Sequence, residues 1–211
     1  TMVSGTADRS ALYLFAADGN LVSGSYASNP AGYAVTLDGG SDYNTVSQST
    51  IVGNASVYSA LYITVSSSNT VLGSYIQGST AAVISASTGT VIRGTIFAAT
   101  NASGASLVFA NGSVNLTIAT STLLAPSLGS GLALSSGNAG NVTIGSVTVS
   151  GAARGLVIST QTAAFCLVVD SVTFRGLASG ATAIHFLGGT FVSTITLANF
   201  EDAGIGTDVS G

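Results

Sequence analysis

Tyrosine is the residue type with the most uneven distribution along this sequence. All seven tyrosines fall within the first 75 of the 211 residues. A ring that carries a hydroxyl group offers an apolar face and a hydrogen bond together, and such side chains are common on recognition surfaces. Alternatively, some of these tyrosines cover loops that pack against the body of the protein. We predict a sugar or protein contact here, with the candidate binding residues Tyr13, Thr36, Tyr62 and Tyr75.

The acidic residues lie near the two ends of the sequence and leave its middle without a carboxylate. Asp18 and the segment 38–42, which carries Asp38 and Asp42, lie in glycine-containing stretches about one repeat apart. Calcium favours several oxygen ligands, so these three aspartates are a candidate calcium site, with plain turns as the alternative interpretation. Residues 43–169 offer no pair of carboxylates for acid–base catalysis. We expect no cofactor.

Histidine and cysteine each occur once. His185 falls on an outward position beside no predicted acid, which makes it a weak catalytic candidate. Cys166 has no partner for an internal disulfide and belongs to no zinc cluster. Its apolar neighbours predict a small buried side chain. Neither residue indicates a reactive centre.

Charge is nearly absent from the composition. Asp, Glu, Lys and Arg make up 6% of the positions, against about 25% in an ordinary soluble domain. The basic residues are four scattered arginines, too few for the basic stripe that a phosphate backbone requires. The longest apolar run, 163–169, is far shorter than the roughly 18 residues of a membrane helix. We therefore expect no nucleic-acid partner and no membrane insertion.

Three apolar anchors recur in order along the chain. The first is an apolar-x-apolar triplet, the second is an apolar residue that usually follows threonine, and the third comes five residues after the second. The spacing between second anchors varies from 20 residues (71 to 91) to 27 residues (91 to 118), while the step of five is constant. The triplets are 12–14, 35–37, 61–63, 82–84, 107–109, 132–134, 156–158 and 184–186; the second anchors are residues 46, 71, 91, 118, 144, 169 and 195.

A constant short step beside loops of variable length is typical of a solenoid with one tight corner. Alternation within each strand places Leu61 and Ile63 on one face and Tyr62 on the other. An antiparallel sandwich does not predict the same corner in every repeat, and a left-handed hexapeptide solenoid needs a period of about 18 residues. The pattern therefore predicts an all-β, three-sided parallel β-solenoid of about eight coils, roughly 40 Å long at about 4.8 Å per coil.

The segment 59–78 resembles the right-handed parallel β-helix repeat of pectate-lyase-like proteins, and the match covers nearly the whole chain. The resemblance implies a right-handed solenoid. Lyases of this family depend on acidic calcium ligands and a basic residue, and the related hydrolases use clustered aspartates, but none of these residues can be carried over to this sequence. The chain is also similar to low-charge repeat regions of bacterial secreted or surface proteins, which implies an extracellular or cell-surface location.

Threonines recur just before the second and the third anchors and form two outward columns. Their β-branched side chains suit exposed strands, and sheet propensity explains them. The alternative is a regular hydroxyl array that matches ice or a crystalline polysaccharide. The first column contains Thr45, Thr70, Thr90, Thr117, Thr143 and Thr194, and the second contains Thr50, Thr95, Thr122, Thr148 and Thr173.

These features predict one β-solenoid domain over residues 1–211, a segment of a longer repeat protein, with no capping helix visible at either end. Uncapped ends favour end-to-end self-association. We expect a non-catalytic, extracellular structural or adhesive module with a polysaccharide or cell-surface ligand. The alternatives are a polysaccharide-binding module that uses the tyrosine-rich N-terminal face, an ice-binding protein, and a polysaccharide lyase or hydrolase.

Overall fold

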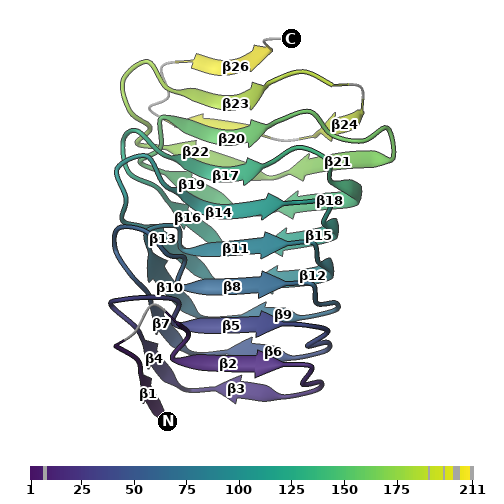
Figure 1. The fold of residues 1–211 in the computed structure, drawn as a ribbon. Coiled ribbons are helices and arrows are strands. Elements are labelled where there is room, and N and C mark those ends of the chain that lie inside the picture. The colour runs from purple at the N-terminus through teal and green to yellow at the C-terminus, as the bar shows by residue number, and fades with distance from the viewer. Residues whose placement is uncertain (7–8, 190, 197, 202–204, 210–211) are drawn as a thin grey trace.

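Short parallel strands that repeat in threes build the molecule. The computed structural model describes residues 1–211 except 7–8, 190, 197, 202–204 and 210–211. The chain winds upward from its N-terminus in right-handed coils, and each coil gives one strand to each of three sheets, A, B and C (Figure 1). Within the described residues no helix occurs, and thus none that is long and apolar enough to cross a membrane. The predicted all-β, right-handed, three-sided parallel β-helix of about eight coils is confirmed.

The strands of each sheet follow one another in spatial order, with every third strand of the sequence as the neighbour. Sheet A contains β1 (Met2–Ser4), β4 (Tyr26–Ser28), β7 (Thr50–Val52), β10 (Tyr75–Gly78), β13 (Ile96–Ala99), β16 (Thr122–Leu124), β19 (Thr148–Ser150), β22 (Val172–Arg175) and β25 (Ala198–Glu201). Sheet B contains β2 (Leu12–Phe15), β5 (Val35–Asp38), β8 (Leu61–Thr64), β11 (Ala82–Ser85), β14 (Ala105–Ala110), β17 (Ser130–Leu134), β20 (Arg154–Ile158), β23 (Thr182–Phe186) and β26 (Ile205–Val209). Sheet C contains β3 (Leu21–Ser23), β6 (Thr45–Ser47), β9 (Thr70–Leu72), β12 (Thr88–Arg93), β15 (Val114–Ala119), β18 (Ala139–Gly145), β21 (Phe165–Asp170) and β24 (Val192–Ile195).

The core is a stack of apolar side chains that point inward from all three sheets. Alternation along β8 buries Leu61 and Ile63 and leaves Tyr62 on the outside, as predicted. Full burial of one such side chain contributes about 1.5–3 kcal/mol, and every coil adds several. On sheet A the inward column consists of Ile51, Ile76, Phe97, Leu123, Val149 and Phe174, all fully buried.

The prediction that Thr90 and Thr95 face outward is wrong. Both are buried, with exposed fractions of 1% and 0%. The pairing places Ile92 and Phe97 at the inward positions of this coil, so the anchors lie one residue later than residues 91 and 96. The sequence around residue 90 offers two apolar residues after a threonine, and the larger Ile and Phe side chains occupy the interior. The step of five residues is kept, from Ile92 to Phe97.

The other nine threonines of the two columns do point outward, but they lie on two different sheets. Thr45, Thr70, Thr117, Thr143 and Thr194 belong to sheet C, and Thr50, Thr122, Thr148 and Thr173 belong to sheet A. Val91 and Val168 interrupt the first column, and Tyr75 and Ile96 interrupt the second. Each sheet therefore carries a single interrupted column, and the two columns do not share one flat face.

Polar side chains buried at the corners hold neighbouring coils together. At the corner between sheets B and C, the Ser41 N–H donates to Ser66 Oγ (3.2 Å) and the Ser87 N–H donates to Ser113 Oγ (3.2 Å). Because a hydroxyl accepts and donates at once, Ser87 also donates to the Ser85 carbonyl (2.8 Å). The same column contains Ser41, Ser66, Ser87, Ser113, Asn138 and Gln161, and the corner between sheets C and A contains Ser49, Ser74, Thr95 and Ser121.

Cys166 differs from its prediction as a buried side chain. It is half-buried on the outward side of β21, between the inward residues Phe165 and Leu167. The apolar run around it is a strand with both faces apolar, and alternation decides which residues enter the core.

Candidate functional site

A groove lies on the outer face of sheet B in the first three coils. Tyr13, Thr36 and Tyr62 are paired across β2, β5 and β8, so they form one outward column. The small Thr36, only 5% exposed, forms the floor between two large neighbours. The groove has a volume of about 410 Å³ and is lined by Arg9, Ser10, Tyr13, Tyr33, Thr36, Asp38 and Tyr62.

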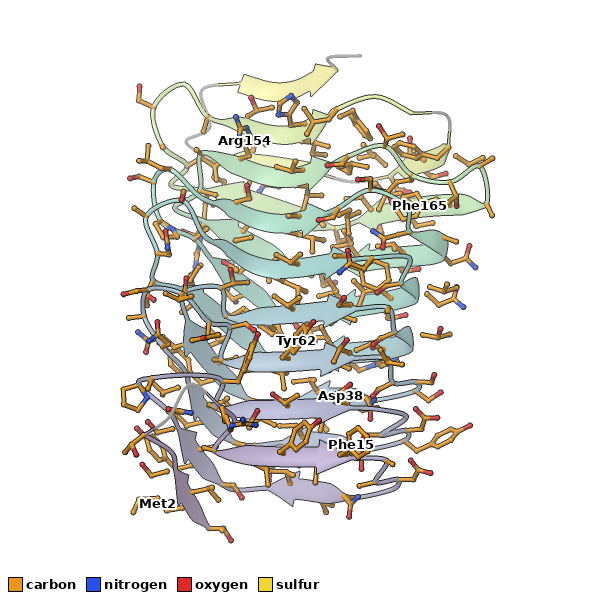
Figure 2. The ribbon with its side chains drawn as sticks, viewed as in Figure 1. Met2, Phe15, Asp38, Tyr62, Arg154 and Phe165 are labelled. Atoms are coloured by element: carbon orange, nitrogen blue, oxygen red, sulfur yellow. The ribbon has the colours of Figure 1, made fainter. Side chains whose placement is uncertain are left out.

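Figure 2 shows Tyr62, Asp38 and Phe15 on this face, at successive levels of the solenoid. The strands β2 and β8 both pair with β5 and are therefore two strand spacings apart, about 10 Å. That distance leaves room for one flat ring system, or one chain of such rings, above Thr36.

Tyr33 and Tyr62 make one wall of the groove, and Tyr58 supports it. The Tyr33 and Tyr62 rings stack with centroids 5.2 Å apart and an interplanar angle of 14°, and Tyr58 packs against Tyr33 at 5.0 Å. Burial, followed by the nearby Tyr62 and Tyr58, raises the pKa of Tyr33 above its ordinary value. Each aromatic contact of this kind contributes about 0.5–1.5 kcal/mol beyond the burial of area. The wall is therefore a rigid, uncharged aromatic surface.

Tyr13 and Asp38 form the opposite side of the groove. The Tyr13 hydroxyl donates to Asp38 Oδ2 (2.8 Å), and the Gly39 N–H donates to Asp38 Oδ1 (2.6 Å). The hydrogen bond to Asp38, followed by burial and the carboxylate charge, raises the pKa of Tyr13 above its ordinary value. These two bonds hold the carboxylate in place, while Tyr13 as a residue remains 52% exposed.

Phe15 explains why residue 39 is glycine. A β-carbon at this position would meet the Phe15 ring at 2.4 Å, and the backbone has a φ of +62°. Only glycine combines that left-handed conformation with the close approach of the ring. The Phe15 ring also packs against Tyr13, with centroids 5.9 Å apart. The turn after β5 and the aromatic side chains of β2 thus fix each other.

The segment before β2 contributes the basic residue Arg9 to the groove. The Ser10 hydroxyl donates to Thr36 Oγ1 (2.6 Å), and the Asn29 side-chain amide donates to the Arg9 carbonyl. The Arg9 side chain is exposed, and in the described part of the chain no carboxylate forms an ion pair with its guanidinium. Among the lining residues, one guanidinium and one carboxylate are the charged groups.

Tyr75 does not belong to this groove. It lies on β10 in sheet A, and its hydroxyl donates to Gln77 Oε1 (3.3 Å). Of the four candidate binding residues, the fold thus brings together Tyr13, Thr36 and Tyr62.

The three candidate calcium ligands serve the backbone of the corner loops. Asp18 Oδ1 accepts the Asp42 N–H (2.9 Å), Asp42 Oδ1 accepts the Ser67 N–H (2.6 Å), and Asp38 binds Tyr13 and Gly39. Among the residues that the structure describes, no three acidic, histidine or cysteine side chains lie close enough to hold a metal ion. Carboxylates that accept backbone N–H groups stabilise the turns between coils.

Four groove residues were not identified as its members from the sequence: Arg9, Ser10, Tyr33 and, in this role, Asp38. Arg9, Ser10 and Tyr33 lie in connections between strands, where the repeat pattern carries no register. Tyr33 has the same parity as the inward residues Val35 and Leu37, so strict alternation would place it in the core, and the sequence carries no signal for its position in the groove.

The sequence matches no protein-family model and no curated protein. The fold is similar to that of an alginate lyase from Paenibacillus, with a TM-score of 0.54 and 10% identity over 97% of this chain and 99% of that chain. The chain is a parallel β-helix module. The surface adhesin PfbA of Streptococcus pneumoniae (TM-score 0.49, 12% identity, 98% of this chain and 60% of that chain) and the pectate lyase Pel9A (0.45, 15%, 84% and 55%) are more distant. At these identities the likeness is one of fold.

Proposed function

We propose that this chain is a non-catalytic, extracellular adhesive module that holds a glycan chain in the groove of sheet B. The observation that carries the proposal is the groove itself, in which Tyr13, Thr36 and Tyr62 are joined by the stacked Tyr33 ring. An extracellular place follows from the ligand, because the polysaccharides of walls and surfaces lie outside the cell.

The chemistry of the lining suits a sugar. A pyranose has flat C–H faces that pack on aromatic rings, and the exposed Tyr13 ring and the Tyr33–Tyr62 wall supply such surfaces. Its hydroxyl groups both donate and accept, so they match the Asp38 carboxylate and the Arg9 guanidinium. The hydrogen bonds that hold Asp38 and Thr36 before binding reduce the entropy lost when a ligand is ordered.

The same lining argues against glycoside hydrolysis in this groove. Asp38 is the one carboxylate among the lining residues, whereas glycoside hydrolysis typically uses two carboxyl groups about 5–9.5 Å apart. Lysine does not occur in the sequence. The single histidine, His185, lies on β23, six strands from β5 along sheet B. The groove therefore has the parts of a binding site but lacks the usual acid–base pair.

Affinity electrophoresis in gels that contain polysaccharides tests the proposal. The wild-type protein is expected to be retarded by at least one of a panel of wall and storage polysaccharides. Tyr62→Ala should lose the retardation, because it removes the exposed wall and its support for Tyr33. Tyr75→Ala is the matched control, since it removes a half-buried tyrosine from a strand of sheet A. Retardation by none of the polysaccharides, or an equal loss in both variants with circular dichroism unchanged, would contradict the proposal.

A further inference from the structure

We infer that the groove selects a single chain of neutral sugars and discriminates against glycans that carry carboxylate or sulfate groups. The inference rests on the proposed function and adds the class of ligand. Three features support it: the charges in and around the groove, the hydrogen-bonding capacity of its polar groups, and its width.

The charges of the lining cancel and its surroundings are acidic. Arg9 and Asp38 contribute one charge of each sign. Asp18 and Asp42 lie on the corner loops that follow β2 and β5, on the same coils, and the whole chain has a formal charge of −4. A polyanion would therefore approach a negatively charged part of the surface, with one arginine to oppose the repulsion.

The polar groups need a partner that both donates and accepts. The Asp38 carboxylate only accepts hydrogen bonds, and the Arg9 guanidinium only donates them. A sugar hydroxyl satisfies either group. A ligand carboxylate offers no donor to Asp38, and in a polyanion every carboxylate that does not pair with Arg9 would add a like charge near Asp38. Neutral sugars avoid this cost.

The width of the groove limits the ligand to one chain. Tyr13 and Tyr62 project from strands about 10 Å apart, and Thr36 forms the floor between them. A crystalline polysaccharide surface requires a flat face many residues wide, and here the tyrosines stand above the floor. The groove consequently favours a separate, soluble or fibril-end chain.

Isothermal titration with oligosaccharides of equal length tests the inference. The neutral probes are cellohexaose, xylohexaose and mannohexaose, and the anionic probes are hexagalacturonate and hexamannuronate. At low ionic strength at least one neutral probe should bind ten times more tightly than either anionic probe. Added salt should narrow this difference, because it screens the repulsion.

The variant Asp38→Asn identifies the residue responsible. It should reduce the preference for neutral over anionic probes at least threefold, because it removes the groove's own negative charge. Asp170→Asn is the matched control, since Asp170 is an exposed aspartate at the end of β21 in sheet C, and it should leave the preference unchanged. Circular dichroism establishes that both variants are folded.

The outcomes separate the two levels of the hypothesis. The neutral-sugar inference is overturned if an anionic probe binds as tightly as every neutral probe. If that binding is lost in Tyr62→Ala, the glycan-binding function is still supported. A preference that Asp38→Asn does not change overturns the charge argument. Binding that Tyr62→Ala does not weaken, with any probe, overturns the proposed function itself.

Discussion

The outer column of sheet B changes character along the solenoid while the inner columns do not. In the first three coils the column reads Tyr13, Thr36 and Tyr62, and it continues as Val83, Val108, Ala133, Val157 and then His185. The inner residues are mostly Leu, Ile, Val, Phe and Ala along the solenoid, with Thr90 as a polar exception. Stacking of coils requires an apolar interior everywhere, but it requires only a strand-compatible residue outside. The column departs from small aliphatic residues at Tyr13, Thr36 and Tyr62 and at His185, and the first of these departures lines the groove.

Size contrast, rather than aromatic content alone, makes the groove. Thr36 lies between two side chains that are much larger than itself. Val108, Ala133 and Val157 repeat the large-small-large order, but with small differences in size and without flanking tyrosines. The two regions thus share a backbone and differ in the side chains above it, which makes each a control for the other.

Because the interior is similar in the N-terminal and the C-terminal coils, removal of a buried ring should reduce stability equally in both. Phe97→Ala and Phe174→Ala each remove a fully buried ring, one near the groove half and one in the C-terminal coils. Each should reduce the free energy of unfolding by about 3–5 kcal/mol, since a cavity remains. Urea denaturation followed by circular dichroism measures the change. A loss below about 1 kcal/mol at Phe174 alone would show that the C-terminal interior is not packed like the rest.

Two buried threonines of one coil should respond in opposite directions to the same change. Thr90 Oγ1 is buried and has no hydrogen-bond partner in the described structure, whereas Thr95 Oγ1 accepts the Ser74 N–H (3.5 Å) and donates to the Arg93 carbonyl (3.1 Å). Thr90→Val should stabilise the protein by about 1 kcal/mol, and Thr95→Val should destabilise it by about 1–3 kcal/mol. Urea denaturation of both variants tests this. Equal signs would contradict the assigned positions.

Tyrosines placed in the later coils should not create a second groove. The double variant Val108→Tyr, Val157→Tyr flanks Ala133 as Tyr13 and Tyr62 flank Thr36. It lacks counterparts of Tyr33 and Asp38, although the exposed Arg154 lies three residues before Val157. We therefore expect its affinity for a glycan that the wild type binds to change less than twofold. Titration calorimetry in a Tyr62→Ala background isolates the new site. Binding restored there would mean that aromatic spacing alone is sufficient.

The hydrogen bond between Tyr13 and Asp38 predicts a small effect of alkaline pH. The pKa of Tyr13 is raised above its ordinary value of 10.0 in the folded protein. The stabilisation from the bond is therefore complete below pH 10 and is lost as the pH rises through the raised pKa. Asp38→Asn should lower the pKa of Tyr13. The pKa of Tyr13 is measured by following tyrosinate absorbance as the pH is raised. The contribution of Tyr13 is the difference between proteins with and without Tyr13→Phe, measured once with Asp38 intact and once in the Asp38→Asn variant. An unchanged pKa would show that the bond does not form in solution.

The regular part of this molecule was predictable from its sequence, and the irregular part was not. The alternation at Leu61–Thr64 and the constant step of five residues express the interior, where apolar side chains must recur. The predictions for Thr90 and Thr95 were wrong because two apolar residues follow each threonine, and only packing decides which of the two enters the core. The buried corner serines, such as Ser87, were not predicted, because the sequence does not distinguish a serine in a buried hydrogen-bonded column from a serine on the surface.

Three of the seven residues that line the groove were predictable for the same reason. Tyr13 and Tyr62 share a strand register, so alternation placed them together with Thr36. Arg9 and Tyr33 come from loops of different length, where no periodicity fixes their position.

The buried serine columns also account for the low charge of the chain. A charged side chain could not occupy a stacked corner, whereas hydroxyls and amides form hydrogen bonds with the backbone of the next coil.

Methyl NMR on one column of sheet B tests the central claim most directly. Thr36 and Ala133 occupy equivalent outward positions, one inside the groove and one in the aliphatic region. During titration with a neutral oligosaccharide that the protein binds, the Thr36 methyl signal should shift and saturate while the Ala133 methyl signal stays in place. Equal shifts of both signals, or a saturating interaction that leaves Thr36 unchanged, would contradict the account.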